Sequence, residues 1–253
     1  MNKVLSALIL VLLCASCGDT GGTSQATDDA GATPARATPA GVKAAKEGTV
    51  NLPKEGTYVY DYESERRNAA TPNATPQRSS SDAELSSKVT VNRDVVTIAD
   101  QTTEGPAVAT VKRRHADDGV YELSFETRAP QGTPGCTFEN PIKILPIPLK
   151  EEALDSQSFE GDGTSCDGER KVTIEGPEDV KDADGAAWST WRIVMVNTVR
   201  TTSGLSSRST LTLWFSPDLG KEVKAESVAE TLDADGQVAA RGESTQLLKS
   251  YPT

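Results

Sequence analysis

The sequence predicts an all-β protein, built as one curved antiparallel sheet or half-barrel of about ten strands behind an N-terminal tether. Two observations predict this class. From Thr57 onward apolar and polar residues alternate, which is the period of a half-buried strand. Turn residues recur roughly every 8–12 positions and no segment carries a helical stripe, a pattern typical of an antiparallel meander.

The first 16 residues have the composition of an export signal. Met1–Lys3 supplies a cation, Val4–Leu13 is apolar, and Ala15-Ser16 places small side chains before Cys17. The apolar run is too short to span a membrane, and its small-small-Cys ending is typical of a lipoprotein signal. We therefore expect cleavage before Cys17 and acylation of this cysteine. The alternatives are an ordinary secretory signal cut nearby, or a short uncleaved anchor.

The expected lipid sets the location of the protein. Two acyl chains on Cys17 would hold it stably in a bacterial cell membrane, facing the periplasm or extracytoplasmic space. Residues 17–50 are expected to form the lipidated cysteine and a disordered linker, because Gly18–Val50 has almost no large apolar residue. Residues 51–253 remain for one folded domain with a sizeable core.

The charge of the chain bears on its partners. A formal net charge of −11 repels phosphate backbones and argues against nucleic-acid binding. The basic cluster Lys112–Arg114 is interpreted as the solvated end of a strand, since Asp117 and Asp118 follow it closely.

Cys136 and Cys166 are expected to form a disulfide, because export places them in a non-reducing compartment and Cys17 is assigned to the lipid. The bond would close a loop of about 30 residues, worth on the order of 3–4 kcal/mol. Metal binding is the alternative, but two thiols with one histidine in the whole chain make a poor zinc site. We expect no metal and no cofactor.

The first half of the domain is expected to begin with a strand that places Tyr58, Tyr60 and Tyr62 on one face. A long polar loop, Ser64–Glu84, follows. The next strands are expected around Val89–Val91, Val96–Ile98, Ala107–Val111 and Tyr121–Phe125, separated by turns at Arg93-Asp94 and His115–Gly119.

The middle is irregular and the last third is the strongest β region. Pro141–Leu149 holds three prolines, so it should lie extended along an edge or cover the open end of a core. Strands are then expected at Val172–Ile174, Trp188–Arg200, Thr210–Phe215, Glu222–Thr231 and Val238–Leu248. The turns between the last of these are Ser216–Gly220 and Asp233–Gly236.

Two of these segments resemble a known group of sequences. Pro141–Leu149 and Trp214–Val223 are similar to the Pro-rich LPxPL stretch and the WxSPxLGxxV hairpin of an uncharacterised group of exported bacterial β-proteins. That group is similar in architecture to the LolA/LppX lipoprotein-carrier half-barrels, in which a curved sheet cups acyl chains. The resemblance covers Tyr58–Val228, and it implies a curved sheet with a groove but no catalytic residue. Glu151-Glu152 departs from the Gly and Trp expected there, and the cysteine pair is an addition.

Tyr58, Tyr60, Tyr62, Trp191 and Trp214 are the candidates for lining such a groove, the alternative being that they fill the core. The expected function is non-enzymatic: a lipid-anchored envelope protein that binds or carries a hydrophobic or lipid ligand. The alternative is a structural or interaction module, without a small ligand, that recruits another envelope protein.

Two features could indicate catalysis or calcium binding, and both have simpler interpretations. His115 could act as a general base, but we interpret it as an exposed turn residue, since no activated nucleophile accompanies it. The repeated Asp-Ala-Asp-Gly segments at Asp182–Gly185 and Asp233–Gly236 look like the middle of a calcium loop. They lack the flanking acidic ligands, so we expect Asx-type turns.

Overall fold

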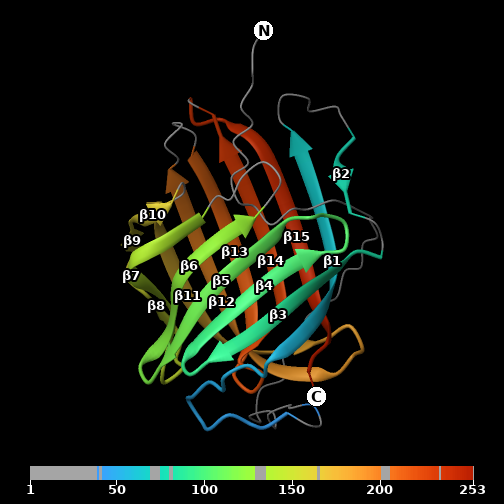
Figure 1. Cartoon of the computed structure of the whole chain (residues 1–253), viewed down its shortest axis with the longest axis vertical. Helices are drawn as coiled ribbons and strands as arrows, with labels where there is room; N and C mark the ends of the chain where they lie inside the picture. The colour runs from blue at the N-terminus through green and yellow to red at the C-terminus, as the bar shows by residue number, and fades with distance from the viewer. Residues whose placement is uncertain are drawn as a thin grey trace, which may run out of the picture.

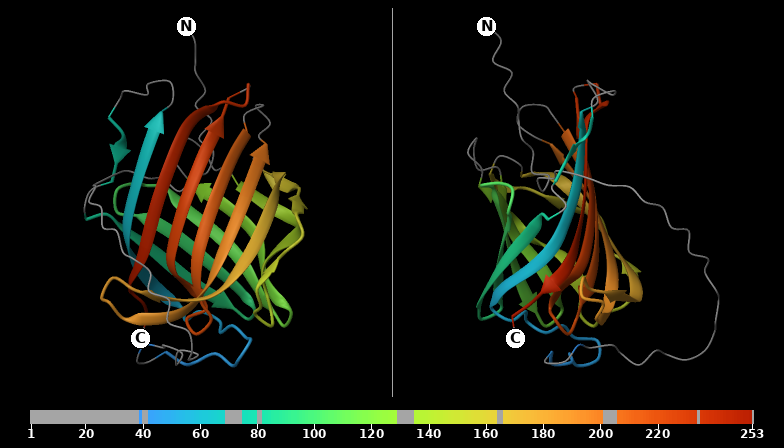
Figure 2. Two further views of the ribbon diagram at one scale, coloured as in Figure 1. Left: turned by 180° about the vertical axis from the view of Figure 1, so that it is seen from behind. Right: turned by 90° about the vertical axis from the view of Figure 1, so that its right-hand side faces the viewer.

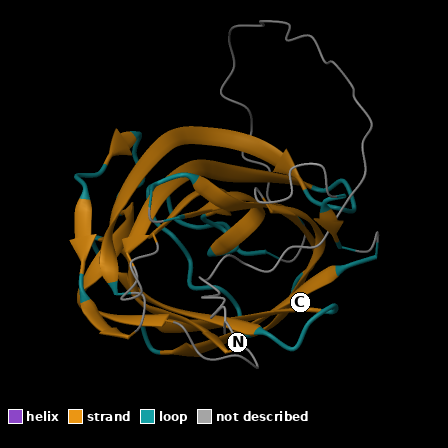
Figure 3. Cartoon of the chain, turned by 90° about the horizontal axis from the view of Figure 1, so that it is seen from above, coloured by secondary structure: helices purple, strands orange, loops and turns teal. Residues whose placement is uncertain are grey.

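The computed structural model describes residues 39, 42–68, 75–79, 82–128, 135–163, 166–200, 206–233 and 235–252. Regular structure in these residues is β only, which confirms the predicted fold class (Figure 3). No helix in this part of the chain is long and apolar enough to cross a membrane. The predicted signal and Cys17 lie outside the described residues.

Fifteen strands of the described residues form one antiparallel sheet, and eleven of them have eight residues or more. Ten of these eleven correspond to the predicted strands, and the other, β7, contains the first part of the proline-rich segment. They are β1 (Gly56–Asn68), β2 (Gln77–Arg78), β3 (Glu84–Asn92), β4 (Val95–Thr102), β5 (Val108–Ala116), β6 (Gly119–Arg128), β7 (Gly135–Pro146), β8 (Glu152–Ala153), β9 (Gln157–Phe159), β10 (Gly161–Gly163), β11 (Asp167–Lys181), β12 (Ala187–Arg200), β13 (Ser206–Ser216), β14 (Lys221–Leu232) and β15 (Val238–Ser250).

The sheet folds over on itself into two layers (Figures 1 and 2). The strand order is β10-β7-β6-β5-β4-β3-β1-β15-β14-β13-β12-β11-β8, so β1 joins the two halves of a meander. Strands β3 to β7 form a front layer, and β1 with β11 to β15 forms a rear layer. β1 pairs with β3 only over Gly56–Asp61 and continues along β15 to Asn68, so the rear layer extends beyond the front one.

A short segment holds the two ends of this sheet together. β9 pairs with β11 and β10 pairs with β7, and only Glu160 separates β9 from β10. The side-chain amide of Gln157 donates to the Lys143 carbonyl and accepts from the Lys143 amide, each at 2.8 Å. This amide therefore pairs with β7 as a strand backbone would, although the sheet does not close into a barrel.

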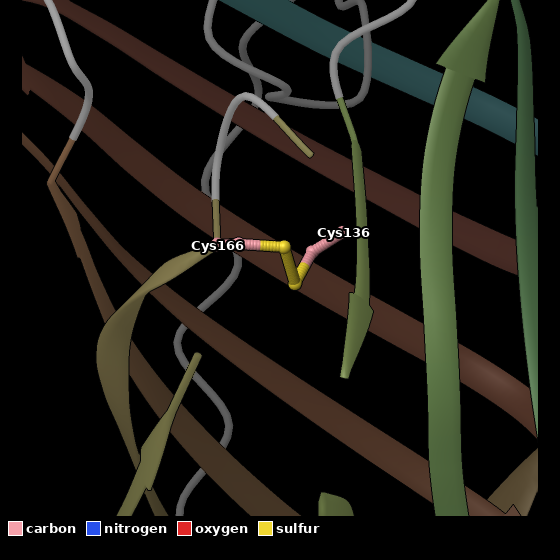
Figure 4. Close-up of a disulfide and its surroundings, with 2 residues drawn as sticks. All are labelled: Cys136 and Cys166. Atoms are coloured by element: carbon pink, nitrogen blue, oxygen red, sulfur yellow. A yellow bond between two sulfur atoms is a disulfide. The ribbon is translucent and has the colours of Figure 1, made fainter. Parts of the chain in front are cut away.

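The Cys136–Cys166 disulfide, predicted from the sequence, links the same two ends (Figure 4). Cys136 lies in β7 and Cys166 directly precedes β11, with 5.0 Å between their Cα atoms. Both cysteines are buried against the rings of Phe138 and Phe159, whose centroids are 5.3 Å apart. The disulfide thus forms part of a small apolar cluster as well as a covalent link.

Two larger clusters make up the rest of the described core. One gathers aromatic and aliphatic residues of β1, β3 and β4 around Trp188 and Leu248. The other joins Val120 and Leu145 of the front layer to rear-layer residues such as Ile193 and Leu213. Because apolar side chains alternate along each strand, both clusters lie between the layers.

One end of the molecule is covered by residues that were expected to belong to the tether. The linker was predicted to reach Val50, but residues 42–50 pack on the folded domain (Figure 1). The Ala45 amide donates to Asp218 Oδ1 at 2.7 Å, and the Asn51 amide donates to the Pro217 carbonyl at 2.9 Å. A Cβ at Gly220, where φ is +70°, would lie 2.2 Å from the Asn51 carbonyl oxygen, so this close approach requires glycine.

One loop prediction needs correction and one segment is confirmed. The polar loop expected from Ser64 starts later, because β1 runs to Asn68 and β2 pairs with it; residues 69–74, 80 and 81 lie outside the described residues. The proline-rich segment from Pro141 lies extended in β7, near the edge of the sheet, as predicted. β10 pairs only with residues 136–138 of β7, which leaves the proline-containing half free of that partner.

The two Asp-Ala-Asp-Gly segments form Asx turns as predicted. Asp182 Oδ1 accepts the amides of Asp184 and Ala186, and its Oδ2 accepts the Trp188 indole N–H at 2.9 Å. Asp233 Oδ1 accepts the amides of two residues of its own turn in the same way. Among the described residues no group of three or more His, Cys, Asp or Glu side chains is placed to hold a metal ion.

Removing the disulfide should destabilise the domain without changing its fold. For a sequence separation of 30 residues, the chain-entropy argument gives a loss of about 3–4 kcal/mol in the free energy of unfolding. We expect this loss in urea unfolding of the Cys136→Ser/Cys166→Ser double variant, and a matching loss when the native protein is reduced. A loss below about 1 kcal/mol would show that the apolar cluster alone holds the two ends.

Candidate ligand-binding site

A cavity of about 200 Å³ lies between the two layers and is partly open to solvent. Its wall is formed by β4 to β6 of the front layer, by β9, and by β11 to β15 of the rear layer. On β13 the lining runs from Ser207 to Leu213, and on β14 it runs from Glu222, two residues after the turn Ser216–Gly220, to Ala229. The cavity therefore borders the packed end of the molecule at Glu222.

The rear wall leaves room for the cavity where small side chains gather on β13, β14 and β15. Ser209 pairs across the strands with Ala229, and Ser227 pairs with Ser244, so small residues lie side by side on three strands. The set that lines the cavity is Ser207, Ser209, Ala225, Ser227, Ala229 and Ser244. Layers about 10 Å apart need large side chains to fill the space between them, and serine and alanine do not fill it.

The rest of the wall combines apolar residues with charged residues from both layers. Val111, Phe125 and Phe159 contribute from one side, and Met195 and Leu211 from the other. Four nearly buried charged residues face each other across the layers: Arg113, Glu122, Arg170 and Glu222, each between 5% and 8% exposed. The cavity is thus lined by apolar side chains together with a small group of charged ones, a combination typical of small-molecule sites.

Two ion pairs cross from one layer to the other beside the cavity. Arg170 Nη1 of β11 lies 2.9 Å from Glu122 Oε1 of β6, and Arg170 Nε donates to Asn197 Oδ1 at 2.5 Å. Arg113 Nη1 of β5 lies 3.6 Å from Glu222 Oε2 of β14. Buried charges of this kind require partners, so each pair constrains how the front layer sits on the rear layer.

Lys221 completes the charged group from the core side. Its ammonium group contacts Glu222 Oε1 and lies 5.2 Å from the Tyr60 ring centroid and 5.7 Å from that of Tyr58. Burial alone would raise the pKa of Glu222, but the charges of Lys221 and Arg113 outweigh it and lower this pKa to about 2. Burial raises the pKa of Tyr58 to about 12 and that of Tyr60 well above its ordinary value. Glu222 is thus ionised and both tyrosines are neutral near pH 7.

Three polar atoms of the cavity wall lack a hydrogen-bond partner among the described residues. They are Asp100 Oδ1, Arg113 Nε and Glu222 Oε2, and the last of these has only the longer contact to Arg113. Burial raises the pKa of Asp100, which lies across from Ser87 on the neighbouring strand. Unpartnered polar atoms are rare in protein interiors, so each of these three atoms would gain from a hydrogen-bonding partner brought between the layers.

The five aromatic residues expected to line a groove do not line this cavity. Tyr58, Tyr60 and Tyr62 are 0%, 0% and 3% exposed and belong to the packed core. Trp191 packs against the second cluster. Trp214 lies on the opposite face of its strand from Leu213, where its indole N–H donates to Glu178 Oε2 and Lys224 Nζ lies 4.3 Å from its ring centroid.

His115 is also placed differently from the prediction. It was expected in an exposed turn, but β5 continues through it to Ala116 and the turn falls at Asp117-Asp118. Its Nδ1 is buried with no hydrogen-bond partner among the described residues. Burial lowers the pKa of His115 to about 4, with a contribution from Arg113, so the ring is neutral at pH 7.

Arg113 is the residue that sequence reasoning missed most clearly. The basic cluster was interpreted as solvated, yet the two-residue period of β5 turns Arg113 inward while Lys112 is exposed. The signal that could have located the cavity is the run of small residues at alternate positions, as in Ala225, Ser227 and Ala229. No protein-family model matches the chain, and a search of curated proteins finds no match.

Replacing Glu222 should show how much stability depends on the buried ion pairs. Glu222→Gln leaves Lys221 and Arg113 without their carboxylate, which we expect to cost about 3–5 kcal/mol at pH 7 in urea unfolding. Since the folded pKa of about 2 lies below the ordinary 4.5, Glu222 stabilises the native state above pH 4.5. That contribution is lost as the pH falls from 4.5 toward 2.

The difference between the native protein and Glu222→Gln should therefore shrink over that pH range. The matched control is Glu243→Gln, which removes a carboxylate paired with Arg241 on the surface and should cost under about 1 kcal/mol. Equal losses in the two variants would contradict the role assigned to the buried pair.

Proposed function

We propose that the chain is a lipid-anchored envelope protein, and that it binds a compact amphipathic molecule in the cavity between its two layers without chemical conversion. The observation that carries the proposal is the cavity of about 200 Å³, which has small residues on its rear wall and buried charges from both layers. Among its described lining residues are several carboxylates and arginines but no histidine or cysteine. This supports binding over nucleophilic catalysis.

The volume of the cavity limits the size of the ligand. An apolar cavity of about 150 Å³ admits benzene, whereas drug-sized ligands occupy about 300–1,000 Å³. By proportion the present cavity suits a body of about eight non-hydrogen atoms, with a larger molecule extending into solvent. The proposed ligand is therefore smaller than the two acyl chains that a lipoprotein-carrier groove would hold.

The extracytoplasmic location rests on the sequence before residue 18 and is supported by the disulfide. Cys136–Cys166 is buried among apolar side chains, and such structural disulfides are typical of exported proteins. An anchor at Cys17 would keep the binding domain at the membrane surface.

Acylation is tested by expressing the full chain in bacteria supplied with a clickable palmitate analogue. We expect labelling of the native chain and loss of label in Cys17→Ala. Cys14→Ala is the matched control, because Cys14 precedes the proposed cleavage site and its removal should leave the label in place. Label retained in Cys17→Ala would contradict the anchor.

Ligand binding is tested by filling the cavity. Hexanol serves as a compact amphipathic probe, followed by amide chemical shifts in an NMR titration. We expect saturable shifts at cavity residues such as Ser209 and Ser227, and at least tenfold weaker binding to Ala229→Leu, which places three more carbon atoms in the cavity.

The control for the filling variant is Val228→Leu, which enlarges the neighbouring side chain on the outer face of β14. It should bind hexanol within about twofold of the native protein, because it does not change the lining. Absence of saturable binding to the native protein, or unchanged binding to Ala229→Leu, would refute the proposed site.

A further inference from the structure

The charged residues beside the cavity differ in how many hydrogen-bond and ion-pair partners they have. Arg170 is well paired, since its Nη1 and Nε contact Glu122 and Asn197. Glu222 contacts Lys221 at short range. Arg113 has only the 3.6 Å contact to Glu222, and its Nε has no acceptor among the described residues. Arg113 is 8% exposed and lines the partly open cavity, and its Nε–H group has no hydrogen-bond acceptor there.

Arg113 and Asp100 differ in whether they can change their charge when no opposite charge is near. The guanidinium group keeps its proton under all conditions in which proteins fold, so Arg113 stays cationic. A buried carboxyl group can take up a proton instead, and burial raises the pKa of Asp100 in this site. When Asp100 is neutral, the group formed by Arg113, Arg170, Lys221, Glu122 and Glu222 carries one positive charge in excess.

We propose that the cavity selects a compact monoanion, a carboxylate with a short apolar body, whose carboxylate binds Arg113. This inference rests on the proposed binding function and specifies its ligand class. The carboxylate supplies the acceptor that Arg113 Nε lacks and, when Asp100 is neutral, balances the positive charge of the group. The apolar body lies against Val111, Leu211 and the small residues of the rear wall.

The opposite preference is the main rival, because Asp100 Oδ1 and Glu222 Oε2 also lack a hydrogen-bond partner. An ammonium group would bind there if Asp100 were ionised. The two cases predict opposite effects of Asp100→Asn, which fixes this position in a neutral form. Carboxylate binding should be kept or strengthened, whereas ammonium binding should be lost.

The experiment compares three probes of equal length in the NMR titration: hexanoate, hexanol and hexylammonium. For the native protein at pH 7 we expect hexanoate to bind at least tenfold more tightly than hexanol, and hexylammonium to bind most weakly. In Arg113→Met the affinity for hexanoate should fall to that for hexanol. The two affinities are compared within each variant, so a general weakening of binding caused by loss of the Arg113–Glu222 pair does not count as loss of the preference for the carboxylate.

Two further variants keep this comparison decisive. Arg208→Met removes an arginine on the outer face of β13, where it pairs with Glu230, and should leave all three affinities within twofold. Arg113→Lys retains a cation without the unpartnered Nε and should keep part of the preference for hexanoate. If Arg113→Met does not fold, the three probes with the native protein and Asp100→Asn decide the question.

The outcomes separate this inference from the function on which it rests. If hexanol binds but hexanoate binds no more tightly, the cavity is a neutral site and the carboxylate assignment is wrong. Stronger binding of hexylammonium, lost in Asp100→Asn, would replace the anion with a cation. If none of the three probes binds, the binding function itself fails.

Discussion

The two ion pairs that cross between the layers are the constraint on which the rest of the structure depends. A single sheet folded over on itself would normally be held together by apolar side chains that interdigitate between its faces. Here Arg113–Glu222 and Arg170–Glu122 take part of that role. Because buried charges must keep their partners, the layers cannot slide or approach freely at this point. The space beside the pairs is then open wherever the opposite wall carries only small residues.

The molecule has two different ends as a consequence. At one end Trp188, Leu219 and the tyrosines of β1 form a dense core, and residues 42–50 cover the turn at Ser216–Gly220. Toward the other end serine and alanine replace the large inward side chains, and the rear layer extends beyond the front one. The cavity thus extends between the layers from the border of the packed core, at Glu222, toward the less densely filled end.

Much of the fold follows from local patterns in the sequence. The alternation of apolar residues and the Asx turns at Asp182 and Asp233 act over short range, and the structure agrees with what they predict. The disulfide was predictable because only two cysteines remain once Cys17 is assigned to the lipid. The cavity depends instead on which faces of distant strands meet. Alternation places Arg113 inward, but nothing within its own strand shows that Glu222 lies opposite, more than a hundred positions later in the chain.

The position of the aromatic residues also depends on strands that are distant in the sequence. Three tyrosines on one face of a strand fit a groove or a core equally well, and the difference lies in what packs against them. Lys221, from a strand distant in the sequence, lies near two of their rings, and their neighbours leave them no exposed surface. A groove requires small residues opposite large ones, and no large residue by itself indicates that arrangement.

Phe159 contacts the disulfide cluster and also lines the cavity. This ring packs in the cluster around Cys136 and Cys166, and it also forms part of the cavity wall. The segment that joins the two ends of the sheet therefore supplies one side of the site, so the covalent link and the shape of the cavity are coupled. Reduction would release the ends that hold Phe159 in place and would loosen this wall before it affected the packed end. The site should accordingly be best formed in an oxidising compartment, which is where an anchor at Cys17 would place it.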